Sequence, residues 1–201
     1  MNQILEIKHA HYFNLLDTNH DGVLNESDFL HLSLRYCSAF GLQTSSRWYS
    51  SIQSIFLGNW KLLSESVESK KAITKEQWLQ FTSNHLITQR ATYQSFVVNQ
   101  TKLLIDLFDT NRDGYLQFNE YIDMLKCYNI NTQSALDSFK ILDLNYDKKL
   151  SHEEIIQSLR QYFTSTNPNT PGNHFFGVIP EIQNLTIPSD VLLQQSLPRL
   201  R

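Results

Sequence analysis

Apolar residues along the chain recur every three or four positions in paired segments, and a short polar run separates the two segments of each pair. This spacing places the apolar side chains on one face of a helix. The segments on either side of residues 17–28 carry Ile4, Leu5, Tyr12, Phe13, Leu15 and Leu16 before the run and Phe29, Leu30, Leu32, Leu34 and Tyr36 after it. Alternating strand patterns and hairpin dipeptides are scarce. The sequence therefore predicts an all-α protein built from helix–loop–helix units.

The polar runs follow one twelve-residue pattern. Its copies are DTNHDGVLNESD at 17–28, DTNRDGYLQFNE at 109–120 and DLNYDKKLSHEE at 143–154. The gap between the first two copies leaves room for a further unit. Aligning the apolar eighth position on Ile73 gives SVESKKAITKEQ at 66–77, in which Lys70 and Gln77 stand where the pattern has acids. We expect this second loop to bind no cation.

Oxygen-bearing residues occupy the positions from which a calcium loop supplies its ligands. Calcium takes six to eight oxygens, and a twelve-residue loop provides them from positions one, three, five, seven, nine and twelve. The predicted metal ligands are Asp17, Asn19, Asp21, Val23 and Asp28 in the first loop, Asp109, Asn111, Asp113, Tyr115 and Glu120 in the third, and Asp143, Asn145, Asp147, Lys149 and Glu154 in the fourth. The seventh residue contributes its carbonyl, and Gln117 at position nine binds directly or through water. We therefore predict three Ca²⁺ sites, at which Mg²⁺ competes.

Two of these loops depart from the pattern. Asp28 at position twelve is one methylene shorter than glutamate, so the first loop is expected to favour Mg²⁺ or to bind Ca²⁺ less tightly. Lys148 at position six of the fourth loop must take a left-handed conformation, at a cost of about 1 kcal/mol. The apolar eighth residues are expected to pair across neighbouring loops, Leu24 with Ile73 and Leu116 with Leu150.

The layout of four units with a silent second loop resembles the sarcoplasmic calcium-binding proteins and their bacterial relative calerythrin, which are EF-hand proteins. It also resembles the coelenterazine-dependent photoproteins. The ending NPNTPGNHFFG, at Asn167–Gly177, is similar to the closing segment of calerythrin. The resemblance implies that the units pair 1–2 and 3–4 in one compact globule. Photoproteins need a histidine in the last helix, where this chain has Ser158, so luciferin binding is a remote alternative.

The repeat divides the chain into an N-terminal pair of units at 1–88, a C-terminal pair at 89–180 and a tail at 181–201. Apolar residues of the tail surround Pro188 and Pro198, and Ser189 is suited to cap a short helix. Two interpretations of the tail stay open. It is either a frayed extension or a segment that docks in a groove whose exposure depends on calcium.

Histidines and tryptophans are interpreted as structural. His9 and His11 lie two apart on a helix and face different directions, so they are predicted to be surface or half-buried residues. His20 and His152 occupy non-ligand loop positions and are predicted to be exposed. Core positions in the first half are predicted for all three tryptophans, Trp48, Trp60 and Trp78.

Charge and cysteine content narrow the function classes. With 17 Lys+Arg against 20 Asp+Glu, the net charge of -3 argues against nucleic acid as a partner. Cys37 and Cys127 are isolated in apolar segments, which predicts reduced, buried thiols. Neither a membrane span nor a signal peptide is recognisable, so we expect a cytoplasmic protein without a membrane partner. We also expect a monomer. No catalytic motif is recognisable either, and an enzyme is not expected.

Buffer and sensor are the competing functions. A sensor opens a methionine-rich groove for its target, and this chain has only Met1 and Met124. Its 12 Phe, 9 Tyr and 3 Trp fit a permanent core better. We expect an intracellular Ca²⁺/Mg²⁺ buffer, and a sensor with an unknown protein target is the alternative.

Overall fold

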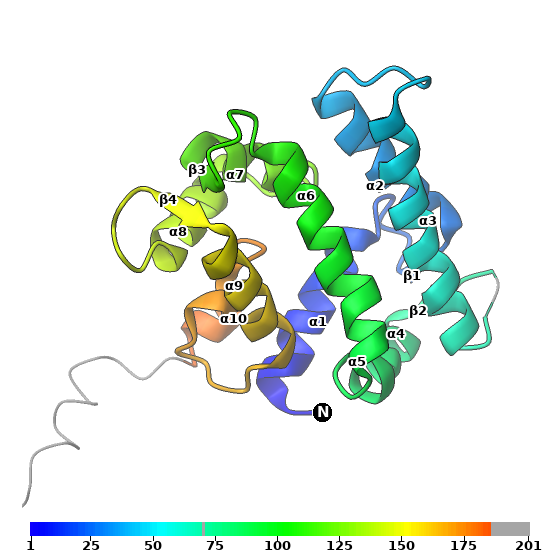
Figure 1. Ribbon diagram of the computed structural model, residues 1–201. Coiled ribbons are helices and arrows are strands. Elements are labelled where there is room, and N and C mark those ends of the chain that lie inside the picture. Colours follow the sequence, from blue (N-terminus) through cyan, green and yellow to red (C-terminus); the bar gives the residue numbers. More distant parts are fainter. Residues whose placement is uncertain (70, 186–201) are drawn as a thin grey trace, which may run out of the picture.

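Helices dominate the computed structural model, which describes residues 1–69 and 71–185 (Figure 1). The first half comprises α1 (Gln3–Leu16), β1 (Val23–Leu24), α2 (Glu26–Ala39), α3 (Arg47–Ser66), β2 (Ile73–Thr74) and α4 (Lys75–Phe81). The second half comprises α5 (Arg90–Tyr93), α6 (Gln100–Phe108), β3 (Tyr115–Gln117), α7 (Phe118–Lys126), α8 (Thr132–Leu142), β4 (Lys149–Ser151), α9 (His152–Thr164) and α10 (Pro180–Gln183). The predicted all-α class and its helix–loop–helix units are confirmed. Each helix within the described ranges is too short or too polar to cross a lipid bilayer.

The units pair through their loops, as the sequence predicts. Strand β1 runs antiparallel to β2 with Leu24 opposite Ile73, and β3 runs antiparallel to β4 with Leu116 opposite Leu150. All four side chains are buried. Because a one-residue slip would turn these side chains to the opposite face, the pairing fixes the register of the second loop as well.

The helix after each loop begins with a capping box, in which the ninth and twelfth residues bond reciprocally. These residue pairs are Asn25 and Asp28, Thr74 and Gln77, Gln117 and Glu120, and Ser151 and Glu154. In the second loop the Gln77 amide oxygen accepts the Thr74 N–H at 2.9 Å, which is the bond that a carboxylate makes in the other three. The second unit therefore keeps the helix start without the acid.

Two wide turns interrupt the helices that join the halves of the chain. Residues Thr82–Leu86 and Gln94–Asn99 are π-helical, on either side of the short helix α5. Each such turn shifts the helix face that follows it. The spacing of apolar residues predicts helices in this region but not these two interruptions.

The core is shared between the two halves. The Tyr36 ring of α2 lies 5.7 Å from the Phe108 ring at the end of α6 and 5.8 Å from the Tyr128 ring. The Tyr12 ring of α1 lies 4.7 Å from Phe176 in the closing segment. The predicted single compact globule is confirmed.

Two of the three tryptophans are core residues. Trp60 and Trp78 are buried, whereas Trp48 is 42% exposed, so its predicted core position is wrong. Trp48 lies in the first turn of α3, two residues after the capping residue Ser46. Residues 43–50 are all exposed or half-buried, so this end of α3 lies at the surface of the described structure.

Helix α1 carries polar residues into the core. Lys8 and His9 are completely buried, and His9 Nε2 lies 3.1 Å from the Phe163 carbonyl oxygen. The predicted surface or half-buried position of His9 is therefore wrong, because α9 covers this side of α1. His11 is half-buried, as predicted, with its Nε2 atom 2.9 Å from the Phe176 carbonyl oxygen.

The two histidines assigned to loop positions differ in burial. His20 is exposed, as predicted, whereas the predicted exposure of His152 is wrong, because this residue begins α9 and is half-buried with its Nε2 atom shielded from solvent. The two cysteines, Cys37 and Cys127, are free and buried, as predicted.

The chain after α9 folds back over α1. Residues Pro171–His174 form a 3₁₀ turn, Phe175 and Phe176 enter the core, and α10 follows. Ile182 of α10 is buried and α10 contacts α1, so the first residues of the predicted tail pack on the body of the protein. Pro188, Ser189 and the rest of 186–201 lie outside the described residues.

Candidate metal-binding loops

Position one of each predicted metal loop is a buried aspartate that organises the turn. Asp17 Oδ1 accepts the Asp21 N–H at 3.2 Å, and its Oδ2 accepts the Gly22 N–H at 2.9 Å. The same two bonds recur at Asp109, at 3.1 and 2.9 Å, and at Asp143, at 3.2 and 3.0 Å. Each aspartate ends the preceding helix, so the helix fixes where its carboxylate lies.

The side chains at positions three and five are hydrogen-bonded to each other at the exposed side of the loop. The Asn19 amide donates to Asp21 Oδ2 at 2.9 Å, and Asp21 Oδ1 accepts the Val23 N–H at 3.0 Å. Equivalent bonds join Asn111 with Asp113, Asp113 with the Tyr115 N–H, Asn145 with Asp147, and Asp147 with the Lys149 N–H. All three loops therefore present the same arrangement of side-chain oxygens.

The acid at position twelve reaches back across its loop. Asp28 Oδ1 accepts the N–H and the hydroxyl of Thr18, both at 3.0 Å, and Oδ2 accepts the Asn25 N–H at 2.9 Å. Glu120 makes the matching pair of bonds with Thr110, at 2.9 and 2.7 Å. The threonine at position two is a feature that the sequence reasoning missed. Its signal is the repeated Asp-Thr-Asn start of these two loops.

The fourth loop lacks this threonine and places Leu144 at position two. Glu154 instead accepts the N–H and the hydroxyl of Ser151, at 2.9 and 2.8 Å. Glu154 is half-buried, whereas Asp28 and Glu120 are buried. The twelfth carboxylate of the fourth loop is thus held from one side only by the contacts described.

Backbone conformation at position six separates the fourth loop from the other two. Gly22 and Gly114 both have a φ of 84°, and Lys148 has a φ of 67°. The expectation that Lys148 takes a left-handed conformation is confirmed. A side chain in this region costs about 1 kcal/mol relative to glycine, and in the fourth loop this cost lowers the stability of the folded chain.

The third loop carries an additional set of contacts to Asp113. Reduced hydration opposes ionisation of this carboxyl, but bonds from the Tyr115 N–H, the Gln117 amide and the Asn111 amide outweigh it and lower the pKa of Asp113. The Gln117 amide donates to Asp113 Oδ2 at 2.9 Å. The positive charge of Lys149 contributes in the same direction.

The donor set of the three loops fits a hard cation. Each loop offers carboxylate, amide and carbonyl oxygens and no sulfur, which is the chemistry that Ca²⁺ and Mg²⁺ prefer. In the second loop, Ser66 and Ser69 turn their hydroxyls to the carbonyl oxygens of Leu62 and Ala72. Among residues 1–69 and 71–185, no three His, Cys, Asp or Glu side chains gather in the manner of a preformed metal cluster. Instead, the carboxylate at position twelve of each of the three loops accepts hydrogen bonds from backbone N–H groups.

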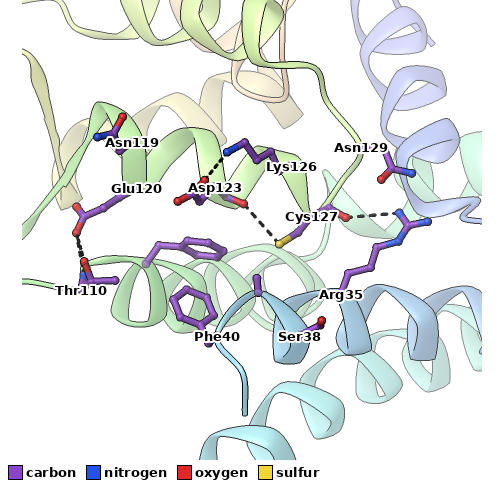
Figure 2. Close-up of a pocket in the computed structure, with 12 residues that line it drawn as sticks. Arg35, Ser38, Phe40, Thr110, Asn119, Glu120, Asp123, Lys126, Cys127 and Asn129 are labelled. Carbon is purple, nitrogen blue, oxygen red and sulfur yellow. Dashed lines mark hydrogen bonds and ion pairs between the residues drawn. The ribbon is translucent and has the colours of Figure 1, made fainter.

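Two cavities are relevant to whether the protein binds a ligand other than a cation. A cavity of about 680 Å³ lies beside the third loop, between α2 and α7, and Figure 2 shows Thr110 and Glu120 at one end and Arg35 and Cys127 at the other. The second is enclosed by aromatic core residues, Phe163 and Phe176 among them, and measures only about 20 Å³. That volume is close to one water molecule.

Two family models match the chain where the first and third loops lie. A model described as "EF hand" matches residues 10–33, and one described as "EF-hand domain pair" matches residues 90–128. Calerythrin from Saccharopolyspora erythraea is 24% identical over 153 residues, which cover 75% of this chain and 86% of calerythrin. Luciferin-binding protein from Renilla reniformis is 20% identical over 164 residues, or 81% of this chain and 87% of that protein.

Among solved structures, a sarcoplasmic calcium-binding protein from amphioxus superimposes with a TM-score of 0.70 at 19% identity, over 90% of this chain and all of that one. The paired helix–loop–helix units and the loop register are those of the EF-hand fold, and the two EF-hand models match the chain at residues 10–33 and 90–128. Within that class, the resemblance to the sarcoplasmic calcium-binding proteins and calerythrin is confirmed.

Proposed function

We propose that this protein binds Ca²⁺ in loops 17–28, 109–120 and 143–154 and serves as a cytoplasmic Ca²⁺/Mg²⁺ buffer. The observation that carries the proposal is the common arrangement of positions one, three and five in these three loops. Relatives named as calcium-binding proteins support it. The seventh carbonyl and the twelfth acid complete each ligand set, with Gln117 at position nine of the third loop.

A filled core supports buffering over sensing. Sensors expose an apolar groove when they bind Ca²⁺, and buffers barely open. Here the aromatic rings of both halves interlock, and the cavity among them is only about 20 Å³. The same volume argues against a luciferin-sized ligand in the core of this form, as does Ser158 in α9.

Calorimetric titration of the whole monomeric chain tests the number of sites. We expect about three Ca²⁺ per chain, and about two after Glu120→Gln, because an amide cannot supply two charged oxygens. Gln77→Glu is the matched control, since it restores an acid to the second loop but leaves its other positions without ligands. A titration without heat, or an unchanged stoichiometry in Glu120→Gln, would contradict the proposal.

Magnesium is expected to compete most strongly at the first loop. Mg²⁺ demands six short, near-octahedral contacts, and the shorter reach of Asp28 suits one oxygen better than two. Repeating the titration in millimolar Mg²⁺ should weaken the first loop more than the third. Equal weakening of both loops would argue against a role for Asp28 in selectivity.

A calcium sensor is the second candidate, and the cavity in Figure 2 favours it. Phe40 and Phe108 line this cavity, and the proposed ligand Glu120 lies at its edge. Movement of Glu120 toward a bound ion would therefore alter a surface suited to a protein target. A Ca²⁺-specific rise in the fluorescence of a dye for apolar surface, absent with Mg²⁺, would favour the sensor, and no rise would favour the buffer.

A further inference from the structure

Lys149 belongs to the fourth loop, but its side chain lies on the third. Antiparallel pairing places Lys149 opposite Gln117, and Tyr115 is the diagonal neighbour on the same face of the ladder. The Lys149 ammonium lies 3.6 Å from the centre of the Tyr115 ring. Both residues are half-buried, so the long side chain rests along the ladder.

The two residues that Lys149 contacts or faces both donate hydrogen bonds to Asp113. Asp113 Oδ1 accepts the Tyr115 N–H at 3.0 Å, and Asp113 Oδ2 accepts the Gln117 amide at 2.9 Å. The ammonium of Lys149 is therefore placed on the side of the ladder where the proposed ligand Asp113 lies. Its charge acts on that carboxylate across the loop boundary.

The ladder between the first two loops carries no such charge. The residue of the second loop that corresponds to Lys149 is Ala72, and the paired residues of β1 and β2 are uncharged. The third loop in turn places Tyr115 and Gln117, both neutral, against the fourth. Among the paired residues of β3 and β4, the Lys149 ammonium is thus the charge that acts from the fourth loop on the third.

We propose that Lys149 is an affinity-determining residue of the third loop, whose ammonium opposes the entry of a divalent cation there. A positive charge beside a ligand carboxylate neutralises part of the attraction that the metal would meet. The carbonyl of the same residue serves as the proposed seventh ligand of the fourth loop, so one residue acts on two sites. This inference rests on the proposed function and deepens it.

Glycine amides allow each loop to be followed separately. Gly114 donates its N–H to Asp109 and Gly22 donates its N–H to Asp17, each at 2.9 Å, so each amide reports its own loop in a ¹⁵N-glycine NMR titration. Free Ca²⁺ would be set with a chelator buffer at low ionic strength. In Lys149→Met the Gly114 midpoint should fall roughly threefold to tenfold, because methionine keeps the length but removes the charge. The Gly22 midpoint should stay unchanged.

Three further measurements separate charge from structure. Lys149→Arg should behave as the unaltered protein, because it keeps a cation over Tyr115. Lys102→Met, at an exposed position of α6, removes one charge elsewhere and should leave the Gly114 midpoint within about twofold. Added salt should shrink the difference between Lys149→Met and the unaltered protein.

The outcomes distinguish the two proposals. If Gly114 responds to Ca²⁺ but its midpoint is the same in Lys149→Met, or if that variant's gain survives high salt, the role of Lys149 is refuted and the calcium function stands. If Gly114 does not respond to Ca²⁺ in any variant, the proposed function of the third loop itself fails.

Discussion

Replacing Lys8 by methionine tests how a buried ammonium contributes to the closing segment. The Nζ atom of Lys8 donates to the carbonyl oxygens of Gln161 and Ser165, at 2.9 and 2.7 Å, and to Asn173 Oδ1 at 2.8 Å. All three acceptors are neutral. Because burial removes hydration from the ammonium without a carboxylate in return, it lowers the pKa of Lys8 to about 7.

The lowered pKa makes the free energy of unfolding depend on pH. Above pH 7 the folded chain has released the Lys8 proton, whereas the unfolded chain keeps it up to the ordinary pKa of 10.5. The unfolded state then binds more protons, so stability rises with pH across this window by up to about 1.4 kcal/mol per pH unit. Between pH 6 and pH 9 the gain amounts to about 3 kcal/mol.

The methionine variant lacks this gain. At pH 6 it loses three hydrogen bonds but also removes a buried charge, and these changes offset one another to within about 1–2 kcal/mol. We therefore expect the stability difference between the unaltered protein and Lys8→Met to grow by about 3 kcal/mol from pH 6 to pH 9. Titrating groups that do not interact with Lys8 cancel in the difference, whereas the pKa values of His9 and His174, which the Lys8 charge lowers, rise in the variant.

Urea unfolding followed by circular dichroism, with chelator present at each pH, measures this difference. Lys126→Met is the matched control, because Lys126 forms an exposed ion pair with Asp123 at 2.7 Å. Its effect should stay below about 1 kcal/mol and should not vary with pH. A Lys8→Met difference that is constant from pH 6 to pH 9 would refute the reasoning, since Lys8 would then keep its proton when folded.

Three further changes have expected outcomes. Lys148→Gly should raise the free energy of unfolding by up to about 1 kcal/mol in the urea assay, because glycine adopts the positive φ at no steric cost, and an unchanged stability would argue against stored strain. Asp28→Glu should raise the Ca²⁺ preference of the first loop over Mg²⁺, as followed by the Gly22 amide, and equal changes for both ions would argue against reach as the cause. Phe176→Ala should lower the free energy of unfolding by about 3–5 kcal/mol, because its ring lies in the shared core, whereas Leu185→Ala, at a 38% exposed position, should cost below about 1 kcal/mol in the same urea assay.

Features encoded within a few residues could be predicted from the sequence. The loop register follows from the twelve-residue spacing, and the apolar eighth residue fixes it even where the acids are lost, as at Ile73. The left-handed backbone at Lys148 follows in the same way, because its position in the turn demands it whatever the side chain. Local geometry and local chemistry agree in these loops, which is why the pattern is informative.

Features that depend on distant partners could not be predicted. The acceptors of Lys8 lie 153 to 165 residues later in the chain, so the sequence around Lys8 gives no reason to bury it. The same holds for His9, whose contact with the Phe163 carbonyl spans 154 residues. Trp48 is the opposite case, because an apolar residue predicted to lie in the core is 42% exposed in the first turn of α3.

Helix α1 joins these two kinds of information. Its end is the loop aspartate Asp17, and its middle holds Lys8 against the end of α9 and the closing segment. The indole N–H of Trp78, from the second unit, donates to the His9 carbonyl oxygen at 2.8 Å, and the Tyr162 hydroxyl of α9 donates to the Lys8 carbonyl oxygen at 2.7 Å. The helix that positions the first proposed metal loop is therefore held by both halves of the chain. Substitutions that loosen the contacts of α1 with α9 should therefore lower the Ca²⁺ affinity of the first loop more than that of the third, because α6 and α7 flank the third loop.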